Sequence, residues 1–595
     1  MEATEEYTRL AKPRRKGILS LVFSRTAIVV LLFAIQILLY VVIYGYSRQY
    51  LPGFTAVTEV FQLIMVLYLI NCRMDATSKV TWMFLIALFP IAASVFLLMT
   101  RTDIGHRKLK GNVARQIEIS RNVLGQSEYV LYKLKESGID DLNHFLNLTG
   151  SFPVYDNNEV TFYPLGENAF EAMLESLRGA TKYIYLEFFI IEEGYMWGNI
   201  LDILMEKAKA GVDVRVMYDG MCEITKLPYN YSRLMEAAGI RCRSFSPLRP
   251  FLSTYYNYRD HRKIMAIDGR VAFTGGVNLA DEYVNRNSRF GHWKDTAIRI
   301  RGDAAQSFTV MFLQMWNLRE PDAEHGSEFK LPAAVVEAWA TRSGGAWTTE
   351  KGRAQTAERA GVQTAEKAGA QTVEKAGAWT TEKGRAQTAE KAGVQESEKA
   401  EVRISQMTDP VKPSGYVMPF ADEPLDQYRV GEIMYVDMLY RANDYVHIMT
   451  PYLILNSDTE NALKYAAERG VDVKLILPGI PDKKLAYSLA KSHYASLIGA
   501  GVKIYEYEPG FVHAKVCVSD DVKAMVGSIN LDYRSLYHHF ECAAYLYGND
   551  CIADIEKDFE DTLNKCMQVT DESVKKEKLF YKITGPLLKV FAPLM

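Results

Sequence analysis

Two stretches of this sequence, far apart in the chain, share one pattern. "HRKIMAIDGRVAFTGGVN" occupies residues 261–278, and "HAKVCVSDDVKAMVGSIN" occupies residues 513–530. Each reads His-x-Lys, four residues, Asp, six residues and then Gly-(Gly/Ser)-x-Asn. Because two imidazoles, two ammonium groups and two amides recur in equivalent settings, the pattern predicts a single site assembled from two halves.

The segments around the two motifs also recur in the same order. "YIYLEFFII" (183–191) reads as a buried strand that is followed by a helix-period stretch and by a second strand, "GVDVRVMYDG" (211–220). "YVHIMTPYLI" (445–454) and "GVDVKLILPG" (470–479) repeat this order before the second motif. The alternation predicts an α/β fold class, with helices packed over a mostly parallel or mixed sheet, present twice as an internal duplication.

The N-terminal region predicts membrane-spanning helices. Ala27 to Tyr46 contains twenty residues without a charge, and Val80 to Thr100 contains twenty-one, with a kink expected at Pro90. Either stretch is long enough to cross a hydrocarbon core of about 30 Å as a helix. Phe54 to Ile70 is also apolar apart from Glu59, so we expect two or three spans. Basic residues flank both ends of this region, which leaves the orientation of the spans open.

The chain of 595 residues is too long for one core, and changes in composition divide it. Residues 346–401 are seven tandem octads that begin with "AWTTEKGR", polar and rich in Gly, which predicts a surface linker rather than a partner-binding repeat. The predicted parts are a membrane region (1–110), a first half (111–342), the octad insertion (343–401), a second half (402–570) and a C-terminal segment (571–595). This last segment mixes lysines with apolar residues, and two interpretations stay open: an interfacial membrane segment or a last helix packed on the second half.

Charge and cysteine content exclude several classes of protein. The net charge of −3 argues against the bulk nucleic-acid binding of strongly basic proteins. The seven cysteines are scattered without a CxxC pair, which predicts reduced thiols rather than a disulfide framework or a zinc site. We expect neither a metal nor another cofactor.

The repeated residue types suit phosphodiester chemistry. One His can attack phosphorus to give a phosphoryl-histidine, while the second donates a proton to the leaving alkoxide and then acts as base for the incoming alcohol. Lysines and asparagines can hold the phosphate oxygens where charge develops. Asp295 and Glu541 occupy matching places about thirty residues after their histidines, so we expect each to orient the His of its own half. Asp268 and Asp520, before turns, favour a structural role in binding backbone amides.

The motifs resemble those of the phospholipase D superfamily. More narrowly, "FTGGVNLADEY", "HWKDT" and "GSINLDYRSLYHHFE", together with the N-terminal spans, resemble bacterial cardiolipin synthases. The resemblance implies a pseudo-twofold pair of α/β/α halves with the site at their junction, in a multi-pass protein of the bacterial cytoplasmic membrane. It further implies His261 as nucleophile, His513 as general acid, and Glu187 and Thr450–Pro451 near the site. The motif residues that it marks as catalytic or phosphate-binding are Lys263, Asp268, Asn278, Lys515, Asp520 and Asn530.

The expected function is the transfer of a phosphatidyl group from one phosphatidylglycerol to another, which gives cardiolipin and glycerol. The expected partners are phosphatidylglycerol, other bilayer phospholipids and the membrane itself, with no nucleic acid. Alternatives are a hydrolytic phospholipase D or a related phosphatidyltransferase, and, less in keeping with the charge, a membrane-tethered nuclease. A non-catalytic membrane scaffold is disfavoured because both motifs are intact. The sequence does not indicate an oligomeric state.

Overall fold

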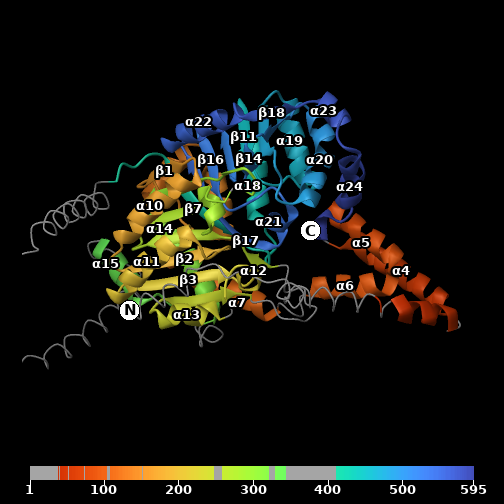
Figure 1. The fold of residues 1–595 in the computed structure, drawn as a ribbon, viewed down its shortest axis with the longest axis horizontal. Coiled ribbons are helices and arrows are strands. Elements are labelled where there is room, and N and C mark those ends of the chain that lie inside the picture. Colours follow the sequence, from red (N-terminus) through yellow and green to blue (C-terminus); the bar gives the residue numbers. More distant parts are fainter. Residues whose placement is uncertain are drawn as a thin grey trace, which may run out of the picture.

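The computed structural model describes residues 38, 41–50, 53–72, 74–102, 107–150, 152–228, 230–246, 258–287, 289–319, 328–342 and 411–594. Its centre is a pair of mixed sheets, each with its own helices, and a group of N-terminal helices projects from the side of the second half (Figure 1). The octads at 346–401 lie outside the described residues, as does most of the predicted span Ala27 to Tyr46.

The first sheet has seven strands in the order β1-β9-β7-β6-β2-β3-β4. Their bounds, in that order, are Glu159–Tyr163, Ala297–Arg301, Val271–Gly275, Lys263–Ile267, Tyr183–Phe188, Asp213–Asp219 and Arg241–Phe245. The strands β2, β3 and β4 are parallel to one another, and the remaining pairs are antiparallel.

The second sheet repeats this arrangement in the order β10-β17-β16-β15-β11-β12-β13 and adds β18 at its edge. The bounds are Tyr416–Asp422, His539–Tyr547, Lys523–Gly527, Val516–Ser519, Tyr445–Met449, Asp472–Pro478, Lys503–Tyr507 and Cys566–Val569. Here too the three strands β11, β12 and β13 are parallel to one another, and the remaining pairs in this order are antiparallel. The short strand β5 (Arg259–Asp260) of the first half joins the same sheet by pairing parallel with β17. The predicted duplication and the mixed sheet are therefore confirmed.

Side chains that alternate along the strands supply two cores to each half. In β6, Ile264 and Ala266 belong to a core that both halves share, whereas Met265 and Ile267 face the helices of the first half. Helix α14 (Ala304–Trp316) is buried along its whole length in the shared core, and α22 (Cys551–Leu563) contributes its apolar face there. The halves thus pack over a continuous apolar interface rather than through a thin linker.

The outer layers consist of further helices of each half. Those of the first half are α10 (Gly166–Arg178), α11 (Tyr195–Lys209), α12 (Cys222–Thr225), α13 (Tyr231–Ala237) and α15 (Ala333–Arg342). Those of the second half are α18 (Val430–Tyr440), α19 (Ser457–Glu468), α20 (Lys484–Gly499), α21 (Tyr533–Tyr537), α23 (Asp571–Lys575) and α24 (Leu579–Lys589). Single 3-10 turns occur at η2 (Asp281–Val284), η3 (Asn317–Arg319) and η4 (Ala592–Leu594).

Three helices precede the first sheet and join the halves more closely than the sequence order suggests. They are α7 (Arg107–Ser120), α8 (Glu128–Glu136) and α9 (Asp140–Thr149). Val130 of α8 and Leu146 of α9 lie in the core of the second half, although these helices come before the first half in the chain.

The projecting N-terminal helices differ in part from the predicted spans. Helix α4 (Phe54–Asn71) is the one helix in the described part of the chain that is long and apolar enough to cross a membrane. The predicted span Val80 to Thr100 is instead two helices, α5 (Ala76–Leu88) and α6 (Pro90–Thr102). The interruption falls at the expected Pro90, because a proline cannot donate a backbone hydrogen bond and its ring crowds the preceding turn.

Candidate active site

Both motif histidines lie where a short strand from one half pairs with the other half. His261 follows β5 (Arg259–Asp260), which runs parallel to the start of β17, and its backbone N–H donates to the Phe540 carbonyl at 2.9 Å. His513 follows β14 (Gly510–Val512), which pairs with β8 (His292–Lys294), and its N–H donates to the Lys294 carbonyl at 2.7 Å. Each histidine is therefore held by backbone bonds to the opposite half.

The carboxylates consequently pair with the histidines in a crossed manner. Nδ1 of His261 lies 2.9 and 3.0 Å from the two oxygens of Glu541, and Nδ1 of His513 lies 2.6 Å from Oδ2 of Asp295. The expectation that each carboxylate serves the histidine of its own half is wrong. The strand pairings explain the difference, because β5 lies beside β17, which carries Glu541, and β14 lies beside β8, which is directly followed by Asp295.

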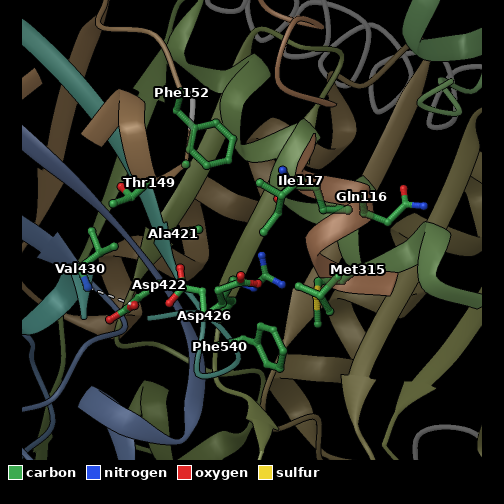
Figure 2. A pocket seen from close by; sticks show the side chains of 15 residues that line it. Gln116, Ile117, Thr149, Phe152, Met315, Ala421, Asp422, Asp426, Val430 and Phe540 are labelled. Carbon is green, nitrogen blue, oxygen red and sulfur yellow. Dashed lines mark hydrogen bonds between the residues drawn. The ribbon is translucent and has the colours of Figure 1, made fainter. Parts of the chain in front are cut away.

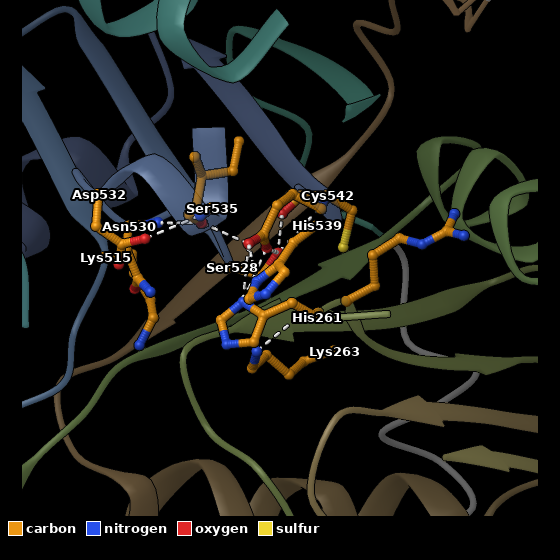
Figure 3. Close-up of polar contacts among 12 residues, drawn as sticks. His261, Lys263, Lys515, Ser528, Asn530, Asp532, Ser535, His539 and Cys542 are labelled. Carbon is orange, nitrogen blue, oxygen red and sulfur yellow. Dashed lines mark hydrogen bonds and ion pairs between the residues drawn. The ribbon is translucent and has the colours of Figure 1, made fainter. Parts of the chain in front are cut away.

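The environment of Glu541 favours its ionised form. The carboxylate is fully buried and accepts hydrogen bonds from the hydroxyls of Ser528 and Ser535 as well as from His261 (Figure 3). Burial alone would raise the pKa of Glu541, but the imidazoles of His261 and His539 and the ammonium of Lys263 hold it below its usual value. An anionic Glu541 fixes the proton of His261 on Nδ1 and leaves a lone pair on Nε2.

The second pair is electrostatically different. Burial raises the pKa of Asp295 to about 7, in spite of the opposing effect of the Lys515 ammonium. Burial, followed by the positive charges of Lys515 and Lys263, lowers the pKa of His513 well below its usual range. Burial lowers the pKa of His261 in the same direction, so the two pairs differ in their carboxylates: the pKa of Asp295 is raised, whereas that of Glu541 is lowered.

The two lysines of the motifs are buried beside the imidazoles. Nζ of Lys263 donates to the His261 carbonyl at 2.5 Å, and Nζ of Lys515 lies 2.7 and 3.0 Å from Nδ1 and Nε2 of His513. Burial lowers the pKa of Lys263 to about 8 and that of Lys515 to about 7, although Glu541 and Asp295 oppose the shift. Charges from both halves act on each lysine, which places the two motifs at one site.

The asparagines differ in how far the protein already occupies their amide groups. Asn278 accepts from the Ile190 N–H at 3.0 Å and donates to the Tyr283 hydroxyl at 2.9 Å. The Oδ1 atom of Asn530 is buried and has no hydrogen-bond partner among the described residues. Asn278 therefore stabilises the wall of the site, whereas the side-chain oxygen of Asn530 remains available to a ligand.

Two further residues, Glu187 and Thr450, contact neighbours of the motif residues. Glu187 is buried 3.0 Å from Nε of Arg262, the residue that follows His261, and burial raises its pKa well above the usual value. The Thr450 hydroxyl accepts from the N–H of Leu531, the residue after Asn530, at 3.3 Å. Glu187 therefore fixes the Arg262 side chain, and Thr450 supports the backbone after Asn530.

Asp268 and Asp520 bind backbone amides and not the imidazoles. This contact corrects the catalytic role that the resemblance implied for them. Oxygens of Asp268 accept from the backbone N–H groups of Thr181, Lys182 and Tyr183 at 2.7–2.8 Å. Oxygens of Asp520 accept in the same way from residues 443–445 at 3.0–3.1 Å. Each thus fixes the start of the neighbouring strand, which is the structural role that the turn position predicts.

Gly276 packs directly against the pair of Asp295 and His513. A Cβ on Gly276 would lie 2.0 Å from Oδ1 of Asp295 and 2.9 Å from the His513 carbonyl. A side chain at this position would displace the carboxylate that contacts His513. Gly276 is therefore required by the crossed pairing itself.

Sequence reasoning missed three residues of the site. Ser528 and Ser535 bind Glu541, and His539 is buried with its Nδ1 3.7 Å from Oε1 of Glu541 and its ring centroid 5.2 Å from that of His261. Neither ring nitrogen of His539 has a hydrogen-bond partner among the described residues. All three lie in the segment "GSINLDYRSLYHHFE", where alternate residues of a strand share a face, and this spacing relates His539 to Glu541.

Figure 2 shows a separate pocket, and some residues that line it are neighbours of site residues in the sequence. Phe540 and Arg262 line it, and each alternates in sequence with site residues, so their side chains point away from the histidines. Asp422 also lines the pocket and accepts from the N–H groups of Val430 and Gly431 at 3.2 and 2.8 Å. None of the predicted site residues lines this pocket, so we do not assign the chemistry to it.

Two groups of side chains in the described part of the chain have atoms close enough to share a cation. One is His261, His539 and Glu541, and the other is His447, Glu556 and Glu560. In the second group, Nζ of Lys474 lies 3.0 Å from Glu560 and already supplies positive charge. In the first, the hydrogen bond from His261 to Glu541 accounts for the short separation.

The fold and the site together define a class: a duplicated α/β protein in which a His-x-Lys motif from each half meets at the junction. A family model described as "Cardiolipin synthase, PLD-like domain" matches residues 173–316 and 435–563, which contain the two motifs. PLD stands for phospholipase D.

Relatives extend this similarity over most of the chain. An uncharacterized protein of Streptococcus mutans serotype c (strain ATCC 700610 / UA159) is 45% identical over 532 residues, covering 89% of this chain and 99% of that protein. A cardiolipin synthase of Geobacillus kaustophilus (strain HTA426) is 30% identical over 447 residues, 75% of this chain and 74% of that one. The solved phosphatidylserine synthase of Haemophilus influenzae Rd KW20 is similar with a TM-score of 0.49 at 13% identity, over 77% of this chain and 98% of that one. The chain belongs to the cardiolipin synthase family with phospholipase D-like domains.

Proposed function

We propose that this chain is a cardiolipin synthase that transfers a phosphatidyl group from one phosphatidylglycerol to another through a phosphohistidine intermediate. The observation that carries the proposal is the pair of buried imidazoles, each hydrogen-bonded to a carboxylate of the opposite half, with two ammonium groups beside them. Family membership supports phospholipid chemistry, and the two unlike imidazole–carboxylate pairs support a division of labour between nucleophile and acid.

In the first step, Nε2 of His261 attacks the phosphorus of the donor. Anionic Glu541 supports the positive charge that develops on this imidazole. The bond between phosphorus and the glycerol oxygen breaks, and His513 donates its Nε2 proton to that oxygen while Nδ1 takes the proton of its hydrogen bond with Asp295. Glycerol leaves, and the phosphatidyl group stays on His261.

In the second step, a hydroxyl of a second phosphatidylglycerol gives its proton to Nε2 of His513 and attacks the phosphorus. The bond between phosphorus and Nε2 of His261 breaks, which restores the free imidazole and releases cardiolipin. Lys263 and Lys515 bind the phosphoryl oxygens through both steps, since the ammonium group of each lies beside the histidine of its motif.

A membrane location is part of the proposal. Helix α4 is the span-length helix of the described residues, and most of its apolar side chains face outward, among them Val57, Leu63 and Ile64. Such a surface requires lipid or protein to cover it. A bilayer would also bring both phospholipid substrates to the site.

The test is incubation of the purified full chain in lipid nanodiscs with phosphatidylglycerol labelled in its acyl chains. We expect labelled cardiolipin and free glycerol from the wild type, and no product from His261→Ala or His513→Ala. Phosphatidic acid as the main product would instead indicate hydrolysis with water as acceptor. Product formation by either histidine variant at the wild-type rate would contradict the assignment of the site.

A further inference from the structure

Helix α24 presents two different apolar faces. One face packs on α20: Gly585 is buried, and a Cβ at this position would lie 2.6 Å from the Ser488 carbonyl. The Tyr581 ring makes an edge contact with Tyr487 of α20, with centroids 5.5 Å apart. This packing accounts for the helix continuing through Gly585 and Pro586.

The opposite face is apolar and exposed. Leu579, Ile583 and Leu587 follow one another at intervals of four residues and are 70%, 51% and 62% exposed, and Phe580 beside them is 52% exposed. Residues spaced by four lie in one row on a helix, so these side chains form a single stripe. We call these four residues the C-terminal stripe. Packing on α20 does not explain it, because the contacts with α20 are made by the other face.

Positive charge surrounds this stripe. Lys575, Lys576, Lys578 and Lys582 are exposed before and within α24. Three acidic residues precede the stripe: Asp571 and Glu572 lie in α23, where Glu572 pairs with Lys576, and Glu577 pairs with Lys491 of α20. Lys575, Lys578 and Lys582 therefore supply most of the positive charge beside the stripe. An apolar stripe bordered by lysines is the arrangement with which a helix lies in a bilayer interface, where anionic headgroups attract the lysines.

The stripe also adjoins the apolar N-terminal helices. Just after α24, the Val590 carbonyl accepts from the Thr81 hydroxyl of α5, and the Phe591 ring lies 5.9 Å from that of Phe84 in an edge contact. Figure 1 shows α24 beside α20 with its end close to α5. Phe84 and Leu88 of α5 are themselves 42% and 53% exposed. The exposed apolar surface therefore continues from α5 to α24.

We propose that α24 is a membrane-interface helix whose C-terminal stripe inserts among the acyl chains of a bilayer rich in anionic phospholipid. The inference rests on the proposed function in one respect: a phospholipid substrate requires the protein to work at a bilayer surface. It assigns a separate task to this helix, which is to hold the second half, and with it His513, against the membrane surface from which substrate enters.

The experiment places an environment-sensitive fluorophore at single introduced cysteines in the full chain, reconstituted in nanodiscs. The test variants are Ile583→Cys and Leu587→Cys, and the matched control is Lys557→Cys, an exposed position on α22. Unmodified protein reports the background from Cys72 and Cys566, the two cysteines that are partly exposed. Nanodiscs contain either phosphatidylglycerol or only phosphatidylcholine, in each case with acyl chains brominated to quench the fluorophore.

We expect a blue-shifted emission and at least threefold stronger quenching at both stripe positions than at the control, and weaker quenching in the phosphatidylcholine discs. Equal quenching at stripe and control positions would overturn the proposal, and so would a blue shift without quenching, which would mean that protein, such as a second copy, covers the stripe. Equal quenching of the stripe in both lipids would overturn the role of the lysines. The measurement needs no turnover, so a failure of the proposed synthase activity would be seen separately in the product assay.

Discussion

The crossed pairing makes a prediction that distinguishes Glu541 from Asp295. Replacing Glu541 by Gln removes the negative charge 2.9 Å from Nδ1 of His261 while it keeps the size of the side chain. The amide can also donate to Nδ1, which would leave the proton on Nε2, the nitrogen that must attack. We therefore expect Glu541→Gln to slow phosphorylation of His261.

The magnitude follows from the geometry. Two unit charges 2.9 Å apart interact by about 6 kcal/mol at an effective dielectric constant of about 20, which is an upper bound for the charge lost. Since about 1.4 kcal/mol corresponds to a factor of ten in rate, the expected loss reaches about 10⁴-fold. Loss of the orienting carboxylate in a serine protease triad has a similar effect, about 10⁴-fold in kcat.

The assay uses a phosphatidyl donor with p-nitrophenol as leaving group, because such a group departs without help from a general acid. Labelling of the protein in a single turnover then reports the nucleophile alone. We expect Glu541→Gln to abolish rapid labelling, while Asp295→Asn labels at close to the wild-type rate but fails to form product from phosphatidylglycerol. If Asp295→Asn blocked labelling and Glu541→Gln did not, the assignment of His261 as nucleophile would be refuted.

Three other predictions concern stability, charge and the repeat. Asp268→Asn should lower the Tm by several degrees with turnover retained, because an amide cannot satisfy the three backbone N–H groups that the carboxylate binds. Each unsatisfied N–H group costs about 1–3 kcal/mol of stability. A differential scanning calorimetry trace unchanged from wild type would contradict this prediction. Inhibition by sulfate should weaken as the pH rises through 7–8, since Lys515 and Lys263, with pKa values of about 7 and about 8, lose their positive charge in this range. Lys515→Met should flatten the lower part of this dependence of inhibition on pH. An unaltered dependence would exclude Lys515 as an anion-binding group. Replacing residues 346–401 by a short flexible linker should leave activity within a few-fold, because loop-closure cost changes by only about 0.6 kcal/mol per doubling of length, and an inactive, unfolded variant would show that the octads are structural.

The fold was predictable from sequence because its signals are local and occur twice. Each "GVDV" strand and the apolar strand before it recur in both copies, and hydrophobic runs of this length between turn residues specify buried strands. The packing of α8 and α9 on the second half was not predictable, since amphipathic helices show which face is buried but not against what. For the same reason the sequence did not separate the two interpretations of the C-terminal segment, where α24 both packs on α20 and exposes an apolar stripe.

The residue types of the site were predictable, but their partners were not. Equal spacing of Asp295 and Glu541 after the two histidines indicated a common task, and both carboxylates do contact an imidazole. Spacing along the chain carries no information about which half supplies the partner, because that depends on the pairing of β5 with β17 and of β14 with β8. His539 was not predictable, because a lone histidine has no sequence pattern of its own. Only the structure shows that it lies beside Glu541.

The exchange of carboxylates between the halves has a consequence for how such a protein can change over generations. Half a gene, expressed alone, would encode an imidazole without its acid and an acid without its imidazole, so it would have to associate with another copy to gain either. In the fused chain, a substitution near Glu541 affects His261, and a substitution near Asp295 affects His513. The sequences of the two halves can therefore diverge in the outer helices, where each half has its own core. At the interface between the halves, substitutions on one side require compensating substitutions on the other.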